Sequence, residues 1–122
     1  MQRHPLSLRV SRTPCCNGDV SVVRGSAGDV VRLRGDIDVA VRADLDGLAD
    51  QLAQDGGPVR LDASAMTFCD STAVHFVAAL LRAGLSVRVQ DPAGRLAGVL
   101  AAAGAPSPLV ASVRSGAVAP RA

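Results

Sequence analysis

The segment PVRLDASAMTFCDSTAVHFVAALLRAGLSVRVQD, residues 58–91, contains the pattern of a strand, a helix and a second strand in succession. Apolar and polar residues alternate in VRLD near its start and in VRVQ near its end, which is typical of strands with one buried face. Between them, STAVHFVAALLRAG has helical spacing, with a predicted core face of Val74, Val77, Ala78 and Leu81. A strand–helix–strand unit of this kind predicts neighbouring parallel strands and therefore an α/β fold.

The segments that precede and follow this unit continue the same alternation of elements. DVSVVRG and DVVRLRG, residues 19–25 and 29–35, predict a hairpin. A helix is expected along one apolar stripe, which consists of Val41, Leu45, Leu48 and Leu52. A further helix is expected over PAGRLAGVLAAAG, and PLVAS after it is interpreted as a short strand.

These elements predict one α/β domain in the order β-β-α-β-α-β-α, with a mixed, mostly parallel sheet flanked by helices. Because every strand alternates, we expect the helices to cover one face well and the other only partly. The expected limits are a flexible N-terminal lead-in over residues 1–18, the domain over 19–113 and a flexible tail over 114–122. The lead-in contains the adjacent Cys15 and Cys16, to which no role is assigned.

Composition excludes several classes of function. The sequence contains no Lys, Glu, Tyr or Trp, so a Schiff-base lysine, a Walker lysine and an HExxH zinc site are all excluded. The formal net charge is +2 and the arginines are scattered, which gives little support for nucleic-acid binding. The cysteines and histidines form no zinc pattern, so no metal or cofactor is expected. No membrane-spanning or secretory segment is visible, and a cytoplasmic protein is the expectation.

Residues 70–72, Asp-Ser-Thr, lie where the central strand meets the following helix, and three interpretations remain open. Asp70 or Ser71 is suited to cap the helix by accepting backbone N–H hydrogen bonds. Ser71 is also suited to accept a phosphate, since a helix N-terminus tolerates negative charge. His75, four residues later, lies on the same helical face as Ser71, which suggests a Ser71/His75 hydrolase. That third interpretation lacks an orienting group and a nucleophile elbow in the sequence.

Three motifs, in this order and spacing, resemble the STAS domain of bacterial anti-sigma factor antagonists from about Asp19 to about Val113. The motifs are the turn Gly35-Asp36-Ile37-Asp38, the run from Leu61-Asp62 through Phe68 to Asp70-Ser71-Thr72, and the helix from Leu96 to Gly104. The resemblance implies a binding module that is a substrate and not an enzyme. Its partner would be an anti-sigma factor with serine kinase activity, and a PP2C-type phosphatase would reset it.

The resemblance also implies roles for individual residues. Ser71 matches the phosphoacceptor, Asp70 the residue before it, and Asp38 an acid that lies near it in the family. Ala73 stands where the family usually has Gly, His75 where a small residue is usual, and Asp36 where Glu is common. We therefore expect a switch and partner-binding surface, which would comprise Asp36, Asp38, Asp70, Ser71, Thr72, Ala73 and His75. The alternative is a STAS scaffold or a lipid-transport accessory subunit without a phosphorylation switch.

Overall fold

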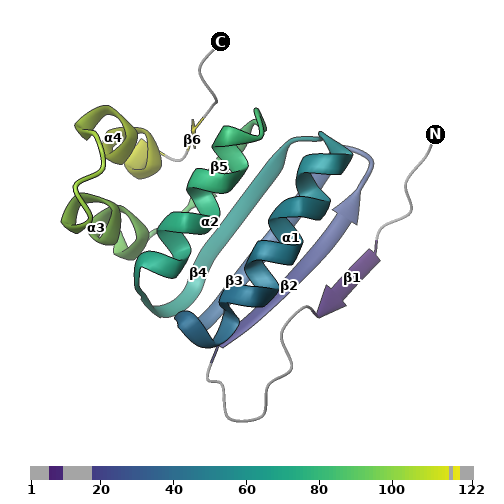
Figure 1. The fold of residues 1–122 in the computed structure, drawn as a ribbon, viewed down its shortest axis with the longest axis horizontal. Coiled ribbons are helices and arrows are strands. Elements are labelled where there is room, and N and C mark those ends of the chain that lie inside the picture. The colour runs from purple at the N-terminus through teal and green to yellow at the C-terminus, as the bar shows by residue number, and fades with distance from the viewer. Residues whose placement is uncertain (1–5, 10–17, 116, 119–122) are drawn as a thin grey trace.

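The computed structural model describes residues 6–9, 18–115 and 117–118, and it contains one sheet in which the strands follow their chain order (Figure 1). The strands are β1 (Leu6–Arg9), β2 (Gly18–Gly25), β3 (Gly28–Ile37), β4 (Val59–Cys69), β5 (Val87–Gln90) and β6 (Ala117–Val118). The helices are the short 3-10 helix η1 (Val39–Val41), α1 (Arg42–Asp55), α2 (Ser71–Arg82), α3 (Arg95–Ala102) and α4 (Ser107–Ser115).

The sheet is mixed, as the sequence pattern predicted. Its central pairs, β3–β4 and β4–β5, are parallel, and the register places Leu61 between Val31 and Val89. Antiparallel pairs flank this centre: β1–β2 and the hairpin β2–β3 on one side, and β5–β6 on the other. The connections through α1 and α2 carry the chain between the parallel strands, and the prediction of a single α/β domain is confirmed.

The hydrophobic core lies between one face of the sheet and the helices, and α1 and α2 lie across this face in Figure 1. Each central strand buries alternate residues, for example Val31, Leu61 and Val89, which are at most 4% exposed. The stripe predicted for α1 is confirmed, because Val41, Leu45, Leu48 and Leu52 are all buried. The alternate residues of β3, β4 and β5 on the opposite face are mostly exposed.

The core face of α2 differs from the prediction. Of the four residues expected there, only Val77 is fully buried, while Val74, Ala78 and Leu81 are half-buried. The buried residues are Thr72, Ala73, Phe76, Val77 and Leu80. The reason is that α2 lies between α1 and α3 and buries a wide sector of its surface. The helix has two neighbouring apolar stripes, and the helical period of the sequence does not show which of them faces the core.

The chain after α3 also differs from the prediction, because PLVAS forms part of the helix α4 and not a strand. Pro108 is tolerated in the first turn, where its missing N–H is not needed. The carbonyl of Pro106 accepts from Leu109 N at 3.0 Å, and Val110 and Val113, one turn apart, are buried. The last strand is instead β6, which pairs with β5.

The N-terminal segment contains a strand that the sequence pattern did not predict. Leu6–Arg9 forms β1 within the stretch interpreted as a flexible lead-in, and it pairs antiparallel with β2. His4 and the adjacent Cys15 and Cys16 lie outside the described residues.

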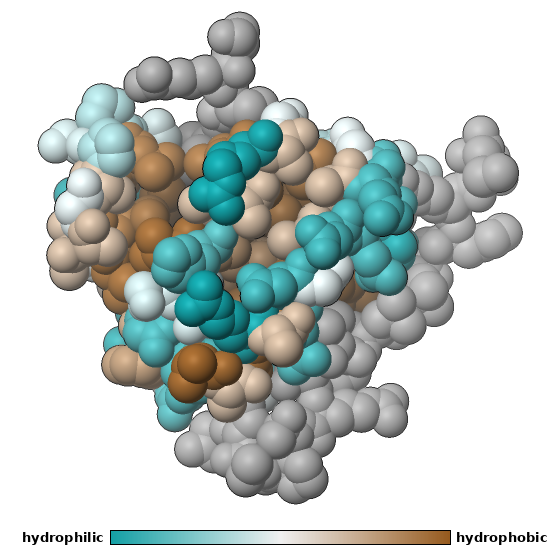
Figure 2. All heavy atoms as spheres, viewed as in Figure 1, coloured by the Kyte–Doolittle hydropathy of each residue, from teal (hydrophilic) through white to brown (hydrophobic). Residues whose placement is uncertain are grey.

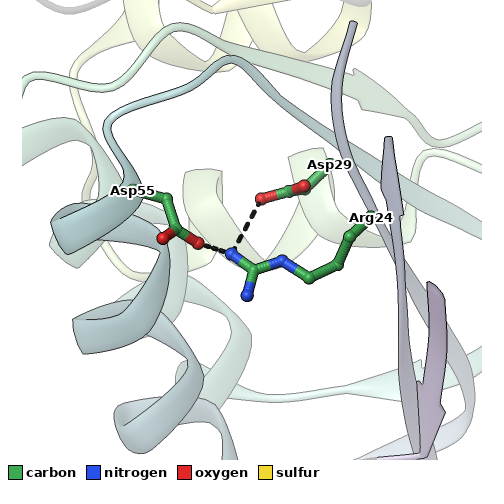
Figure 3. A network of polar contacts seen from close by, with 3 residues as sticks. All are labelled: Arg24, Asp29 and Asp55. Atoms are coloured by element: carbon green, nitrogen blue, oxygen red, sulfur yellow. Dashed lines mark hydrogen bonds and ion pairs between the residues drawn. The ribbon is translucent and has the colours of Figure 1, made fainter. Parts of the chain in front are cut away.

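An ion-pair network joins the β2–β3 hairpin to the end of α1 (Figure 3). Arg24 of β2 pairs with Asp55, the last residue of α1, and its Nη2 lies 3.5 Å from Asp29 Oδ2 of β3. Asp29 is only 3% exposed, so a nearby cation offsets part of the cost of burying its carboxylate. The network attaches α1 to the sheet at the end opposite to the one at which α2 begins.

Candidate functional site

The predicted site residues gather where β3 and β4 end side by side. Ile37 and Cys69 are register partners, and Asp70 N donates to the carbonyl of Ile37 at 3.3 Å. From this point β3 continues into η1 through Asp38, and β4 continues into α2 through Asp70. The topology therefore places two short acidic turns, distant in sequence, next to each other.

Asp70 is the N-cap of α2. Its backbone is extended, with φ −124° and ψ −159°, and its carboxylate accepts from Thr72 N at 2.8 Å. Of the two residues suited to this role, the structure selects Asp70, so Ser71 is the first residue of the helix. Its side chain is therefore not needed as a cap and is available for another role.

Three consecutive side chains at the start of α2 have very different exposures. Ser71 is exposed, whereas Thr72 is 4% and Ala73 1% exposed. The expectation that Thr72 and Ala73 lie on a partner surface is therefore wrong, because both face the core. Only one hydroxyl of the Ser-Thr pair is accessible to a modifying enzyme, and it is that of Ser71.

Asp36 and Asp38 are held near Ser71 by hydrogen bonds of their own. The carboxylate of Asp38 caps η1 by accepting from Ala40 N at 3.0 Å. The carboxylate of Asp36 accepts from Thr67 Oγ1 at 2.9 Å, which links the ends of β3 and β4. The predicted acids of the turn are thus brought to the same end of the sheet as Ser71, where they contribute negative charge.

His75 lies one turn into α2 and is exposed. Among the described residues, no hydrogen bond joins its ring to Ser71 Oγ, and none joins it to a carboxylate that could orient it. A nucleophilic serine requires both contacts. The arrangement therefore does not activate Ser71 as a nucleophile, and His75 remains a candidate for partner contact.

Two large apolar side chains are exposed at this end, and the sequence pattern did not single them out. Val39 is 72% and Phe68 50% exposed, and they are the exposed large hydrophobic residues of the described chain. Phe68 faces outward because the β3–β4 register shifts: Gly35 pairs with Met66 but Asp36 pairs with Phe68, so Thr67 is skipped. A regular two-residue alternation from Met66 would have buried Phe68, and nothing in the sequence marks the shift.

Phe68 also borders an open apolar hollow of about 330 Å³. The other wall is the face of α3 that begins after the left-handed Gly94 and contains Gly98, Val99 and Ala102. We call the surface formed by Asp36, Asp38, Val39, Phe68, Asp70 and Ser71 the Ser71 end. It combines acidic groups, a free hydroxyl and exposed apolar area, which is the character of a protein-binding surface.

Cys69 lies beneath the Ser71 end, and its thiol is in an environment that makes it unreactive. It is 6% exposed, and its thiol donates to the carbonyl of Arg95 with Sγ 3.6 Å from the oxygen. Burial, with smaller contributions from Asp91 and Asp70, raises the pKa of the thiol to about 11. Cys69 is therefore a small buried side chain and not a reactive thiol.

The described residues contain neither a metal site nor a membrane-spanning helix. No group of three or more His, Cys, Asp or Glu side chains there is arranged to hold a metal ion. Within the same residues, every helix is too short or too polar to cross a bilayer.

The comparison with known families agrees with this geometry. Residues 20–111 match the family described as "Mlab, STAS domain". The match includes most of β2, all of β3 to β5 and α1 to α3, and the whole of the Ser71 end. No curated protein shows a significant match to the chain. A STAS domain is typically a binding and regulatory module without catalytic activity of its own, and this chain belongs to the STAS domain family.

Proposed function

We propose that the protein is an anti-sigma factor antagonist that acts in the cytoplasm and is released from its partner by phosphorylation of Ser71. The observation that supports this most directly is the exposure of Ser71 at the start of α2, next to a buried Thr72. The partner is an anti-sigma factor with serine kinase activity. A PP2C-type phosphatase then returns the protein to its binding form.

The unmodified Ser71 end suits a protein partner. Val39 and Phe68 supply exposed apolar area, and the neutral hydroxyl of Ser71 can be covered at low cost. Burying such side chains contributes roughly 25 cal/mol per Å² of apolar surface. Binding would therefore rest on these side chains, and the hydroxyl would lie within the covered area.

A phosphate on Ser71 would reverse this balance without unfolding the domain. It adds a charge of about −1.5 to −2 at pH 7. The helix N-terminus tolerates that charge, so α2 stays in place. The carboxylates of Asp36, Asp38 and Asp70 lie at the same end, so the phosphate increases an existing negative charge. To cover this end, a partner would then have to remove water from a strong anion, and any acidic group of the partner would be repelled by it.

The experiment is incubation with each anti-sigma kinase encoded in the same genome and ATP, followed by intact-mass measurement. The wild-type protein should gain one phosphate, and Ser71→Ala should gain none. Thr72→Val is the matched control, since it removes the neighbouring hydroxyl at almost constant shape and should still gain a phosphate. Equal phosphorylation of Ser71→Ala would contradict the assignment, and no binding or modification by any of these kinases would contradict the function.

A second candidate is a STAS scaffold or a lipid-transport accessory subunit that binds through the same end without a phosphorylation switch. This second candidate is supported by the family description, which names Mlab and not an anti-sigma factor antagonist. Val39 and Phe68 would serve such a partner equally well. An adjacent kinase or sigma-factor gene favours the first candidate, whereas adjacent transport genes favour the second.

A further inference from the structure

We propose that the uncovered face of the sheet is a second docking surface, which binds an acidic segment of a partner protein. Four exposed arginines from three adjacent strands share this face: Arg32 and Arg34 of β3, Arg60 of β4 and Arg88 of β5. They are scattered in the sequence, and the parallel register gathers them. We call these four residues, with Asp62 between them, the arginine face. The proposal is independent of the function proposed for the Ser71 end.

Arg60 and Arg88 are direct register partners in neighbouring parallel strands. Their backbones are therefore about 4.8 Å apart, and their side chains leave the sheet on the same side. Among the described residues, no carboxylate lies within ion-pair distance of either guanidinium. Two like charges side by side destabilise a sheet. An anion placed between them would relieve that repulsion, and each guanidinium offers paired N–H donors for a carboxylate.

The β3 side of the face has a different pattern, in which the charges alternate in sign. Arg32 Nε lies 4.0 Å from Asp62 Oδ2, and Asp62 Oδ1 also accepts from Ser64 N at 3.0 Å and from Ser64 Oγ at 2.5 Å. Burial alone would raise the pKa of Asp62, but the hydrogen bonds from Ser64 and the charges of Arg32 and Arg34 lower it overall. Asp62 is thus ionised at neutral pH and separates two positive regions.

The surface beside the unpaired arginines is hollowed. An open depression of about 490 Å³ is bordered by Arg60 and Arg88 together with the Gly28 turn, Pro58 and Ser86. A second depression of about 250 Å³ is lined by the same two arginines, Val89 and Gln90. Acidic side chains of a partner could therefore reach the guanidinium groups from more than one direction.

The charge pattern favours a protein over other anionic partners. Binding of single-stranded nucleic acid depends on aromatic stacking, but Phe76 is buried and Phe68 lies near the end of β4 opposite to Arg60. A membrane surface would favour exposed apolar anchors, but the exposed ones, Val39 and Phe68, belong to the Ser71 end. The carboxylate of Asp62 would repel either polyanion, whereas a folded or extended acidic segment can match alternating signs.

The Arg60–Arg88 pair of the arginine face and Ser71 are far enough apart to be occupied together, whereas Arg34 is only two residues from Asp36 of the Ser71 end. Arg60 is the second residue of β4, and Ser71 lies just beyond its end at Cys69. At about 3.3 Å per residue, the two are roughly 30 Å apart along the strand. The arginine face also lies on the side of the sheet opposite to α1 and α2. An acidic segment held by Arg60 and Arg88 would therefore leave Ser71 uncovered.

The test is a titration of the full chain with a fluorescent peptide of alternating Asp and Gly residues at low ionic strength. The double variant Arg60→Gln/Arg88→Gln should bind at least about tenfold more weakly than wild type. The matched control, Arg82→Gln/Arg114→Gln, removes the same charge from exposed positions on α2 and α4 and should change binding by less than about twofold. Amide shifts in the NMR spectrum of the wild-type complex should map to β4 and β5.

Three results would overturn the proposal. The first is an equal loss of binding in both double variants, which would indicate attraction by net charge alone. The second is the absence of saturable peptide binding by the wild-type chain. The third is tighter binding of duplex DNA, or of vesicles that contain anionic phospholipid, than of the peptide. Thermal unfolding of each variant verifies that a loss of binding is not a loss of structure.

Discussion

Ser71 and the Arg60–Arg88 pair lie at opposite ends of β4, and the Ser71 end and the arginine face arise from opposite features of the chain. The arginine face is mainly a product of regularity: a two-residue alternation within each of three strands places arginines on one side, although the β3–β4 register shifts between Arg32 and Arg34. The Ser71 end is a product of irregularity: a register shift exposes Phe68, and two capped turns place Asp38 and Asp70 side by side. Regular surfaces can be derived from the period of a sequence, whereas this irregular one required the structure.

The largest expected effect comes from substituting the two phenylalanines of the chain, one of which should support stability and the other partner binding. Phe76 is 2% exposed, so Phe76→Ala should lower the free energy of unfolding by about 3–5 kcal/mol. Phe68 is 50% exposed, so Phe68→Ala should lower it by less than about 1 kcal/mol. Denaturant unfolding monitored by circular dichroism measures both.

Phe68→Ala should also weaken partner binding by about 2 kcal/mol, or roughly thirtyfold, if the Ser71 end is the binding surface. Calorimetric titration with the partner measures this change. A large loss of stability in Phe68→Ala, with unchanged partner affinity, would mean that Phe68 supports the fold and that the comparison between the two surfaces is wrong.

The next effect concerns Cys69, and it tests whether the hydroxyl of Ser71 is the one reactive group at this end. The thiol has a pKa of about 11 in the folded protein, against an ordinary value of 9.0. Because the folded-state pKa is raised, the stabilising contribution is complete below pH 9 and is lost as the pH rises through 11. The loss should approach about 2–3 kcal/mol.

Cys69→Ala should show a flatter dependence of unfolding free energy on pH between 9 and 11 than wild type. The measurement is denaturant unfolding across this pH range, in a Cys15→Ala/Cys16→Ala background so that no other thiol titrates. Identical slopes for the two proteins, or rapid alkylation of native Cys69 at neutral pH, would show that this thiol is accessible and reactive.

Much of the fold followed from patterns that have a simple period. The β2–β3 hairpin, the apolar stripe of α1 and the parallel β4–α2–β5 unit were all predicted, because each element buries one face. The helix over residues 107–115 was not predicted, because Pro108 is compatible with both the start of a strand and the first turn of a helix.

The candidate site was only partly predictable from the sequence. The gathering of Asp36, Asp38 and Asp70 was implied by the family resemblance, and its physical cause in the structure is that β3 and β4 end side by side. The burial of Thr72 and Ala73 depends on the rotation of α2 about its axis. That rotation is set by packing against α1 and α3, which local sequence does not encode.

The smallest of these effects tests the two acidic caps that shape the Ser71 end. Asp70→Ala removes the hydrogen bond to Thr72 N and should cost about 1 kcal/mol of stability. Asp38→Ala removes the corresponding bond to Ala40 N, but η1 spans only Val39–Val41, so we expect a smaller cost. Chemical denaturation of the two variants measures the difference. Equal or reversed costs would mean that Asp70 does not fix the start of α2 and the position of Ser71.

The central claim is that the Ser71 end is a partner surface controlled by phosphorylation. Its most direct test is calorimetric titration of the anti-sigma factor with two forms of the full chain, one unmodified and one with phosphoserine at position 71. The phosphorylated form should bind at least about thirtyfold more weakly, while its circular dichroism spectrum and unfolding temperature remain close to those of the unmodified form. Equal affinities of the two forms for the same partner would contradict the claim.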